Sequence, residues 1–227
     1  MIFAGKVFNL IRLTQFVLLL LITQTVIAEE CGPPPPGSFG PFDYTSAEGQ
    51  RNLKLVEDYH FTPKVEALIS GKSGSVEQDL NYTLQRFPNH HRALYSVANY
   101  YTFSRNKHRK AVPEQSLLSF ECYVSIAKQF APHDHMIPLI VGLYHHNNEE
   151  YQKALAEFNE AEKWMAENPD VLYNLGLLHM DLGNIDLATQ YAEKVQLNYP
   201  EYPLDGLYQR LKEKGITVKN DESTTVE

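Results

Sequence analysis

Catalytic sequence motifs are missing from this 227-residue chain. It has no nucleophile elbow, no phosphate-binding loop and no zincin motif, and no Ser, Cys or carboxylate stands in a recognisable catalytic setting. Cys-x-x-Cys and His-Glu-x-x-His spacings are also absent, although nine histidines are present. We therefore expect no enzyme activity, no cofactor and no metal site. An enzyme with an unrecognised site and a soluble carrier of a small ligand or metal are the alternatives.

Basic residues are fewer than acidic ones, so the net charge is −8 and the isoelectric point is near 5.6. Broad binding to nucleic acid or to an anionic membrane needs a basic surface, so we expect neither. One basic stretch, residues 103–114, is an exception, and its cations are Arg105, Lys107, Arg109 and Lys110. It is either an ordinary solvated loop or a docking point for an acidic partner.

The longest apolar run near the N-terminus is too short to span a bilayer. Residues 16–22 are seven consecutive apolar residues that follow Lys6 and Arg12. Val26 and Ala28 supply the small residues that signal peptidase needs, so the pattern predicts a signal peptide cleaved after Ala28. We expect a periplasmic or secreted protein without membrane insertion after cleavage; an uncleaved anchor is the alternative.

Cysteine occurs twice, as Cys31 and Cys122. In an oxidising compartment we expect these two residues to form a disulfide, with two unrelated thiols as the alternative. Cys31 precedes four consecutive prolines, residues 33–36, which predict an extended polyproline leader. The bridge would then fasten this leader to the rest of the protein.

Two segments within residues 136–200 superimpose on each other at an offset of 34 residues. Gly142 corresponds to Gly176 and Ala154 to Ala188 at this offset. The pattern resembles the tetratricopeptide repeat, whose signature is a bulky residue, Leu-Gly, an aromatic residue, then Ala, Phe and a closing Pro. The positions that carry the resemblance are Gly142, Ala154, Phe158, Ala161, Gly176, Ala188 and Pro200.

The resemblance implies an all-α fold in which stacked helical hairpins form a solenoid. The glycines are expected to let the second helix of each hairpin approach closely, at Ala154 or Ala188. His145 and His179 stand where the family has an aromatic residue and are expected to pack between the two helices. The concave face of such a solenoid usually holds a partner protein or an extended peptide.

The sequence predicts eight segments. They are a signal peptide at 1–28, a proline-rich leader at 29–44, N-terminal helices that cap the solenoid at 45–90, a degenerate repeat with the basic insertion at 91–134, repeats at 135–168 and 169–202, a C-terminal capping helix at 203–215 and a disordered tail at 216–227. Thr45 and Glu48 predict a capping box at the start of the first helix.

A Gly-Pro-Phe-Asp-Tyr segment, residues 40–44, precedes the solenoid and resembles that of small exported tetratricopeptide proteins of bacteria. The function expected on this basis is an exported interaction module. It would bind a partner protein or its extended tail and support assembly of an envelope complex.

Overall fold

The structure is a computed structural model that describes residues 31–32, 39–106 and 117–216. Every helix named below belongs to the unit Gly32–Glu227, the second of the two units into which the chain divides. All regular secondary structure in the described residues is helical, as the sequence predicts. Within these residues, no helix has both the length and the apolar character needed to cross a bilayer.

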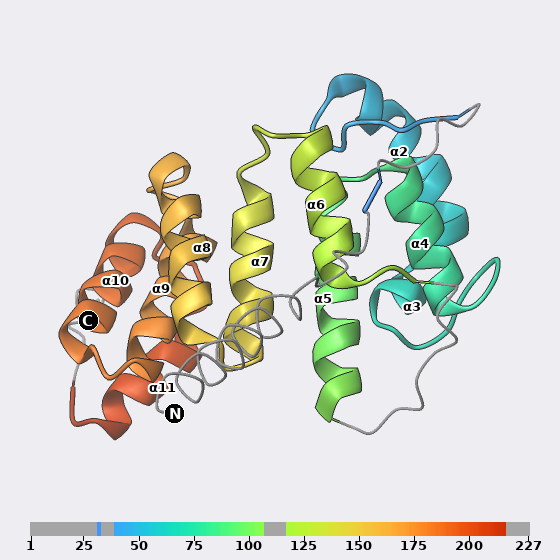
Figure 1. Cartoon of the computed structure of the whole chain (residues 1–227). Helices are drawn as coiled ribbons and strands as arrows, with labels where there is room; N and C mark the ends of the chain where they lie inside the picture. Colours follow the sequence, from blue (N-terminus) through green and yellow to red (C-terminus); the bar gives the residue numbers. More distant parts are fainter. Residues whose placement is uncertain (1–30, 33–38, 107–116, 217–227) are drawn as a thin grey trace, which may run out of the picture. The chain divides into compact units, whose positions relative to one another are not determined.

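The helices of the second unit follow one another with short connections, apart from the long segment between α5 and α6 (Figure 1). Their bounds are α2 Ala47–His60, α3 Pro63–Glu66, α4 Val76–Arg86, α5 His91–Asn106, α6 Phe120–Phe130, α7 Met136–Asn147, α8 Tyr151–Trp164, α9 Pro169–Asp181, α10 Ile185–Asn198 and α11 Asp205–Glu213.

Helices α5 to α10 form three hairpins, α5/α6, α7/α8 and α9/α10, which stand in a row (Figure 1). The first helices of the hairpins also contact one another, α5 with α7 and α7 with α9, and α11 packs against α9. We call α5, α7, α9 and α11 the inner layer. Helices α3 and α4 contact α5 and close that end of the row. The architecture is thus a solenoid of helical hairpins, with α11 covering its last repeat.

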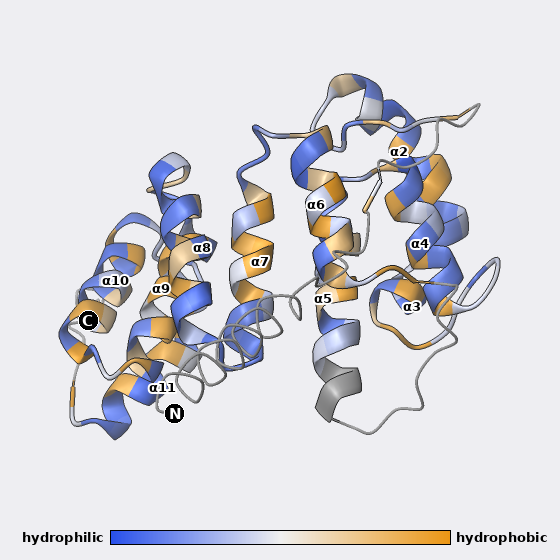
Figure 2. Ribbon diagram, in the orientation of Figure 1, coloured by the Kyte–Doolittle hydropathy of each residue, from blue (hydrophilic) through white to orange (hydrophobic). Residues whose placement is uncertain are grey.

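The core is continuous along the solenoid because successive apolar clusters share a helix. The first cluster draws on helices from α3 to α7, the second on α7, α8 and α9, and the third on α9, α10 and α11. Figure 2 shows apolar residues along most of α7, which belongs to two of these clusters. Six of the predicted repeat positions, Gly142, Ala154, Phe158, Ala161, Gly176 and Ala188, are buried, whereas Pro200 is exposed in the turn after α10.

The first helix begins one residue later than the predicted capping box. The prediction of Thr45 as its cap is wrong, because the Thr45 hydroxyl donates to the Asp43 carboxylate at 2.8 Å. Ser46 is the cap instead, and its hydroxyl oxygen accepts the N–H of Gly49 at 2.9 Å. Glu48 lies in the first turn, where its charge interacts favourably with the helix dipole.

The hairpin turns of the two clear repeats place a residue in the left-handed region at the same repeat position. Gly183 has φ of 78°, and Glu149, 34 residues earlier, has φ of 61°. Glycine adopts this conformation without strain, whereas a residue with a Cβ does so at a cost. The turn geometry is therefore set by hairpin packing, because it persists without the glycine that favours it.

Both cysteines are disulfide-bonded, and neither is free. Since the chain has two cysteines, Cys31 is bonded to Cys122, as the sequence predicts. Cys122 lies in α6 and is buried. The two residues are 91 positions apart. In the chain-entropy description, a bridge that closes a loop of this length stabilises the fold by about 4.6 kcal/mol.

The glycines of the repeats lie at close approaches, but their nearest neighbours differ from those expected. A Cβ added to Gly142 would lie 2.3 Å from Cδ1 of Phe158, one turn beyond Ala154. A Cβ added to Gly176 would lie 2.6 Å from Cδ2 of Leu207 in α11. At Gly142 the atoms nearest to an added Cβ thus belong to Phe158, whereas at Gly176 the carbonyl oxygen of Ala188 is also near, at 3.7 Å. The bulky Phe158 reaches further than Ala154 and fills the space over Gly142.

Gly142→Ala should lower the free energy of unfolding by about 1–3 kcal/mol, because the methyl group would overlap a fully buried aromatic ring. Gly176→Ala should cost less, since the end of the Leu207 side chain can rotate away. Urea denaturation of both variants measures the difference. Equal stability of Gly142→Ala and wild type would contradict this packing.

Candidate functional site

An open groove with a volume of about 340 Å³ lies along the inner layer. Its lining residues come from α5, α7 and α9 and from the turn before α11. Six of them occupy just two positions of the repeat, which are Arg92, Met136 and Asp170 at the first and Tyr95, Leu139 and Tyr173 three residues later. Residues three apart share one face of a helix, so each repeat presents the same face to the groove.

The floor of the groove is the apolar helix α7. Met136, Leu139 and Leu143 follow the spacing of a single helix face and all line the groove. Leu139 is also a member of the core cluster between α7, α8 and α9. Because the same helix contributes to the core on either side, only this strip of α7 is left for a ligand. The floor of the groove can therefore contact the apolar side chains of a ligand.

Tyrosines form the sides of the groove. Tyr95 from α5 is 41% exposed, which is high for a ring on a packed helix. On the opposite side, the rings of Tyr173 and Tyr202 lie 5.7 Å apart, and the Tyr202 hydroxyl donates to Asp170 at 2.6 Å. Burial, together with this hydrogen bond, raises the pKa of Tyr202, so it remains a neutral donor. The groove combines flat aromatic surface with a few fixed polar groups.

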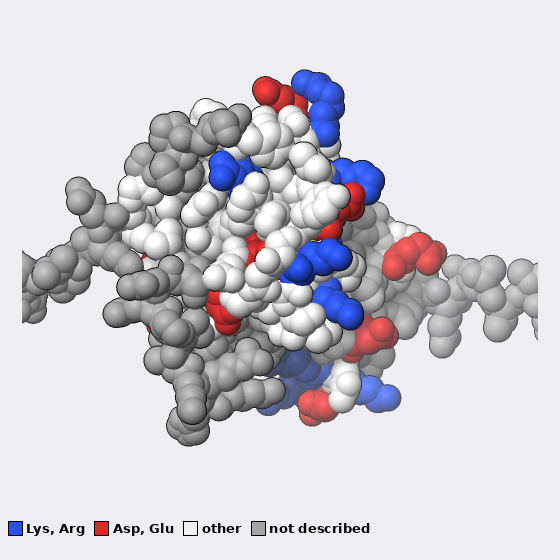
Figure 3. All heavy atoms as spheres, turned by 90° about the vertical axis from the view of Figure 1, so that its right-hand side faces the viewer, with Lys and Arg blue, Asp and Glu red and all other residues white. Residues whose placement is uncertain are grey.

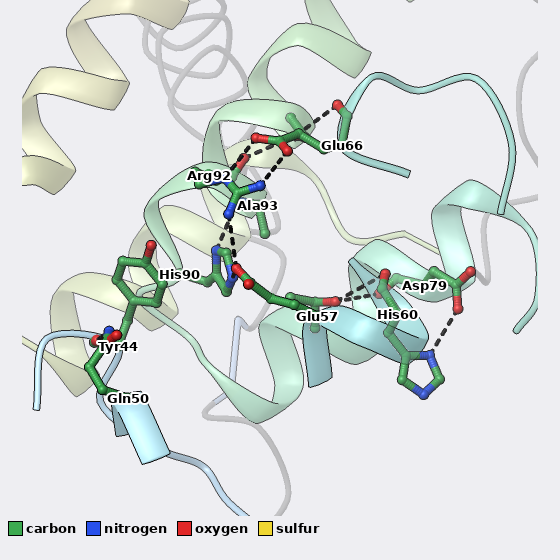
Figure 4. A network of polar contacts seen from close by, with 11 residues as sticks. Tyr44, Gln50, Glu57, His60, Glu66, Asp79, His90, Arg92 and Ala93 are labelled. Carbon is green, nitrogen blue, oxygen red and sulfur yellow. Dashed lines mark hydrogen bonds and ion pairs between the residues drawn. The ribbon is translucent and has the colours of Figure 1, made fainter. Parts of the chain in front are cut away.

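Arg92 lies at the α5 end of the groove, but its charge is already paired. Its Nε donates to Oε1 of Glu66 at 2.8 Å, its Nη2 donates to Oε2 of the same carboxylate, and its Nη1 donates to Glu57 at 3.1 Å (Figure 4). The hydrogen bonds from Arg92 lower the pKa of Glu66. A fork of this kind fixes both partners in orientation. The Arg92 side chain is therefore fixed at the side of the groove, and its positive charge is neutralised by Glu66 and Glu57.

His90 belongs to the same network of polar contacts through Glu57. It is fully buried, its Nδ1 accepts the N–H of Ala93 at 3.2 Å, and the proton on Nε2 is therefore directed to Glu57 at 3.2 Å (Figure 4). Burial lowers the pKa of His90. The ring of Tyr44, from the leader, lies 4.5 Å from the His90 ring. The neutral imidazole of His90 thus contacts both the leader, through Tyr44, and α2, through Glu57.

Several other histidines pair with carboxylates or aromatic rings. His91 contacts Asp134, His145 contacts Glu150 and His146 contacts Asp181, at distances of 2.8, 2.6 and 2.7 Å, and His135 stacks on Trp164. Among the described residues, no three or more His, Cys, Asp or Glu side chains form a group that could hold a metal ion. His179 is buried against Tyr191 of α10, the predicted packing role, whereas His145 contacts the turn instead.

The face formed by α2 to α4 carries charges of both signs (Figure 3). Figure 3 views this end of the molecule and shows Lys and Arg groups lying beside Asp and Glu groups. An example is Lys54, which pairs with Asp58 at 2.7 Å on the exposed side of α2. Of the predicted docking residues, Lys107, Arg109 and Lys110 lie outside the described residues, as does the side chain of Arg105. That docking point remains a prediction.

The groove residues themselves were not predicted, although a signal for them exists. Tyr173 follows Leu139 at the 34-residue offset, and Tyr95 precedes Leu139 by 44 residues, the same offset lengthened by the insertion. Alignment of the repeats identifies the glycines and alanines that pack inside. The same alignment, read at the positions that vary, would have shown which side chains face outward along the inner layer.

Comparison with known proteins agrees with this geometry over part of the chain. The family model of the tetratricopeptide repeat matches residues 147–215, which include α8 to α11 and the α9 side of the groove. No curated protein and no solved structure matches the chain. Stacked repeats of this kind serve as scaffolds for protein–protein interaction.

The neutral, buried His90 should make the protein less stable in mild acid. Its folded-state pKa lies below the unfolded value near 6.5, so the unfolded chain takes up a proton first as the pH falls. The stability lost through this group is at most about 1.4 kcal/mol per pH unit. We expect the loss between pH 7.5 and 5.5 to be smaller in His90→Gln than in wild type, measured by urea denaturation. Identical pH dependence of the two proteins would contradict this assignment.

Proposed function

We propose that this chain is an exported interaction module that binds an extended segment of a partner protein in the groove of the inner layer. Its mechanism is binding and not reaction. The observation that carries the proposal is the groove itself, in which two positions of three successive repeats face the same open space. In cellular terms, the module would support assembly of an envelope complex.

The dimensions of the groove favour a short extended segment. Packed helices lie about 8–10 Å apart, so the path from α5 across α7 to α9 is roughly 16–20 Å long. An extended chain advances about 3.3 Å per residue, and about six residues would cross this path. Alternate side chains of such a segment point to one face, where the apolar strip of α7 would receive them.

The sequence and the disulfide support export. Residues 1–28 have the order of a signal peptide, with two cations before the apolar run and small residues before the expected cleavage site after Ala28. Disulfides such as Cys31–Cys122 persist in oxidising compartments and are rare in the cytosol. A periplasmic or secreted location accounts for both features.

A matched pair of substitutions tests the groove. Tyr95→Glu places a charge on its apolar side, and Tyr59→Glu makes the same change at a tyrosine of α2 that is 56% exposed. We expect wild type and Tyr59→Glu to capture a stoichiometric partner from envelope extract of the source cells. Tyr95→Glu should lose the partner by about tenfold or more, the effect of losing a central aromatic contact.

The proposal has two distinct ways to fail. Equal capture by Tyr95→Glu and Tyr59→Glu would move the binding site away from the groove. Absence of any stoichiometric partner with wild type would contradict an interaction module. Thermal denaturation of the variants, with melting temperatures near that of wild type, checks that both are folded.

A further inference from the structure

The groove and the pocket that continues it each contain a carboxylate whose hydrogen bonds leave one oxygen available. At the α9 end, Oδ1 of Asp170 accepts the Tyr202 hydroxyl, and no described group bonds to Oδ2. In the neighbouring pocket, Oδ1 of Asp43 accepts the N–H and hydroxyl of Thr45 and an amide proton of Asn89, at 2.8–2.9 Å. In the described part of the chain, Oδ2 of Asp43 has no partner.

Asp43 belongs to a second pocket that continues the groove. This pocket has a volume of about 500 Å³ and shares His91 and Met136 with the groove. Its apolar lining includes Met165, and its acidic groups are Asp43 and Asp134. Both Asp134 oxygens are occupied by His91 and by neighbouring amides, so Asp43 is the acid with an available oxygen. Burial acts to raise the pKa of Asp43, but the hydrogen bonds from Asn89 and Thr45 outweigh it and lower the pKa overall.

The balance of charge along this path is negative. The N-termini of α5, α7 and α9 each contribute roughly half a positive charge. The negative charges of Asp43, Asp134 and Asp170 together exceed that sum. Arg92 adds one positive charge, but it faces both Glu57 and Glu66. An acidic ligand would have to break this fork to reach Arg92. A cation meets available carboxylate oxygens without breaking any bond.

We propose that the segment bound in the groove is basic, with apolar side chains on the α7 floor and a lysine or arginine at each end that pairs with Asp170 or Asp43. This inference rests on the proposed function and specifies the chemistry of the partner. The two cations would be about six residues apart, the length of the path from α9 to α5. The net charge of −8 on the whole chain favours the encounter with such a segment.

Three labelled peptides separate charge from apolar contact. They are Lys-Ser-Leu-Ser-Leu-Ser-Lys, the same peptide with Glu at both ends, and the same peptide with Gln at both ends. We expect fluorescence anisotropy at low salt to give the lysine peptide at least tenfold higher affinity than the glutamate peptide. This advantage should shrink in 0.5 M salt, because exposed charges are screened.

Single substitutions then locate the charge. Asp170→Asn and Asp43→Asn should each weaken the lysine peptide by roughly two- to fivefold and leave the glutamine peptide unchanged, as expected for one solvent-exposed ion pair. Asp186→Asn is the matched control, because Asp186 lies in the first turn of α10 as Asp170 does in α9, but outside the inner layer. It should bind all three peptides like wild type.

The outcomes distinguish this inference from the proposed function. Equal affinity for all three peptides, with loss of binding in Tyr95→Glu, would overturn the basic partner and leave the groove as the binding site. Tighter binding of the glutamate peptide would also overturn it. Failure of every peptide to bind, while wild type still captures a partner, would exclude a short basic segment. Failure of both measurements would remove the proposed function as well.

Discussion

The apolar character of helix α7 is the constraint on which both the core and the groove depend. One flank of α7 packs with α5 and α6 in the first cluster, and the other packs with α8 and α9 in the second. A helix that is apolar nearly all round has to be covered on every side. Neighbouring hairpins cover two sides, and the strip through Met136 and Leu143 is what remains. The groove floor thus follows from continuity of the core, and selectivity has to come from the residues around it.

The two ends of the groove are built from different parts of the chain. The α9 side consists of regular repeat elements and the turn that contains Tyr202. The α5 side depends on α2 and α3, which lie outside the regular repeats and supply Glu57 and Glu66. Because these two acids immobilise Arg92, the N-terminal helices contribute to the electrostatics of the groove in addition to covering the core. This asymmetry would distinguish the two directions in which the proposed segment could lie.

The sequence predicted the hairpin architecture well because that architecture depends on local periodicity. The 34-residue offset between Gly142 and Gly176 arises because one helical hairpin is repeated along the chain. The structure contains the helices of both hairpins, α7/α8 and α9/α10. The closest neighbour of each glycine could not be predicted, since it depends on how far Phe158 and Leu207 extend across the interface. Sequence patterns specify which helix faces pack, whereas side-chain reach decides which atoms touch.

The site was less predictable than the fold, because its contacts join distant positions. Arg92 binds Glu66 and Glu57, which precede it by 26 and 35 residues in elements that have no repeat signature. The carboxylate of Asp43 shows the same limit. A sequence pattern favoured Thr45 as a cap, but the carboxylate two residues earlier captures its hydroxyl. Competition of this kind between local hydrogen bonds is decided by tertiary packing.

The C-terminal part of the leader, residues 39–44, is hydrogen-bonded to the helices and contributes Asp43 to the second pocket. The Arg86 guanidinium donates to the carbonyl of Phe39, the N–H of Phe42 donates to the carbonyl of Arg86, and the N–H of Tyr44 donates to Asn89, at 2.7–2.9 Å. These bonds hold Asp43 in the second pocket, next to the groove, and each contributes only about 1 kcal/mol.

Three such bonds alone would hold an N-terminal segment weakly, since ordering its backbone costs roughly 1–2 kcal/mol per residue. The disulfide at Cys31, eight residues before Phe39, supplies a covalent anchor that keeps the segment at high effective concentration near α6. The oxidising compartment that the sequence predicts is therefore also the environment in which Asp43 would be best held in the second pocket.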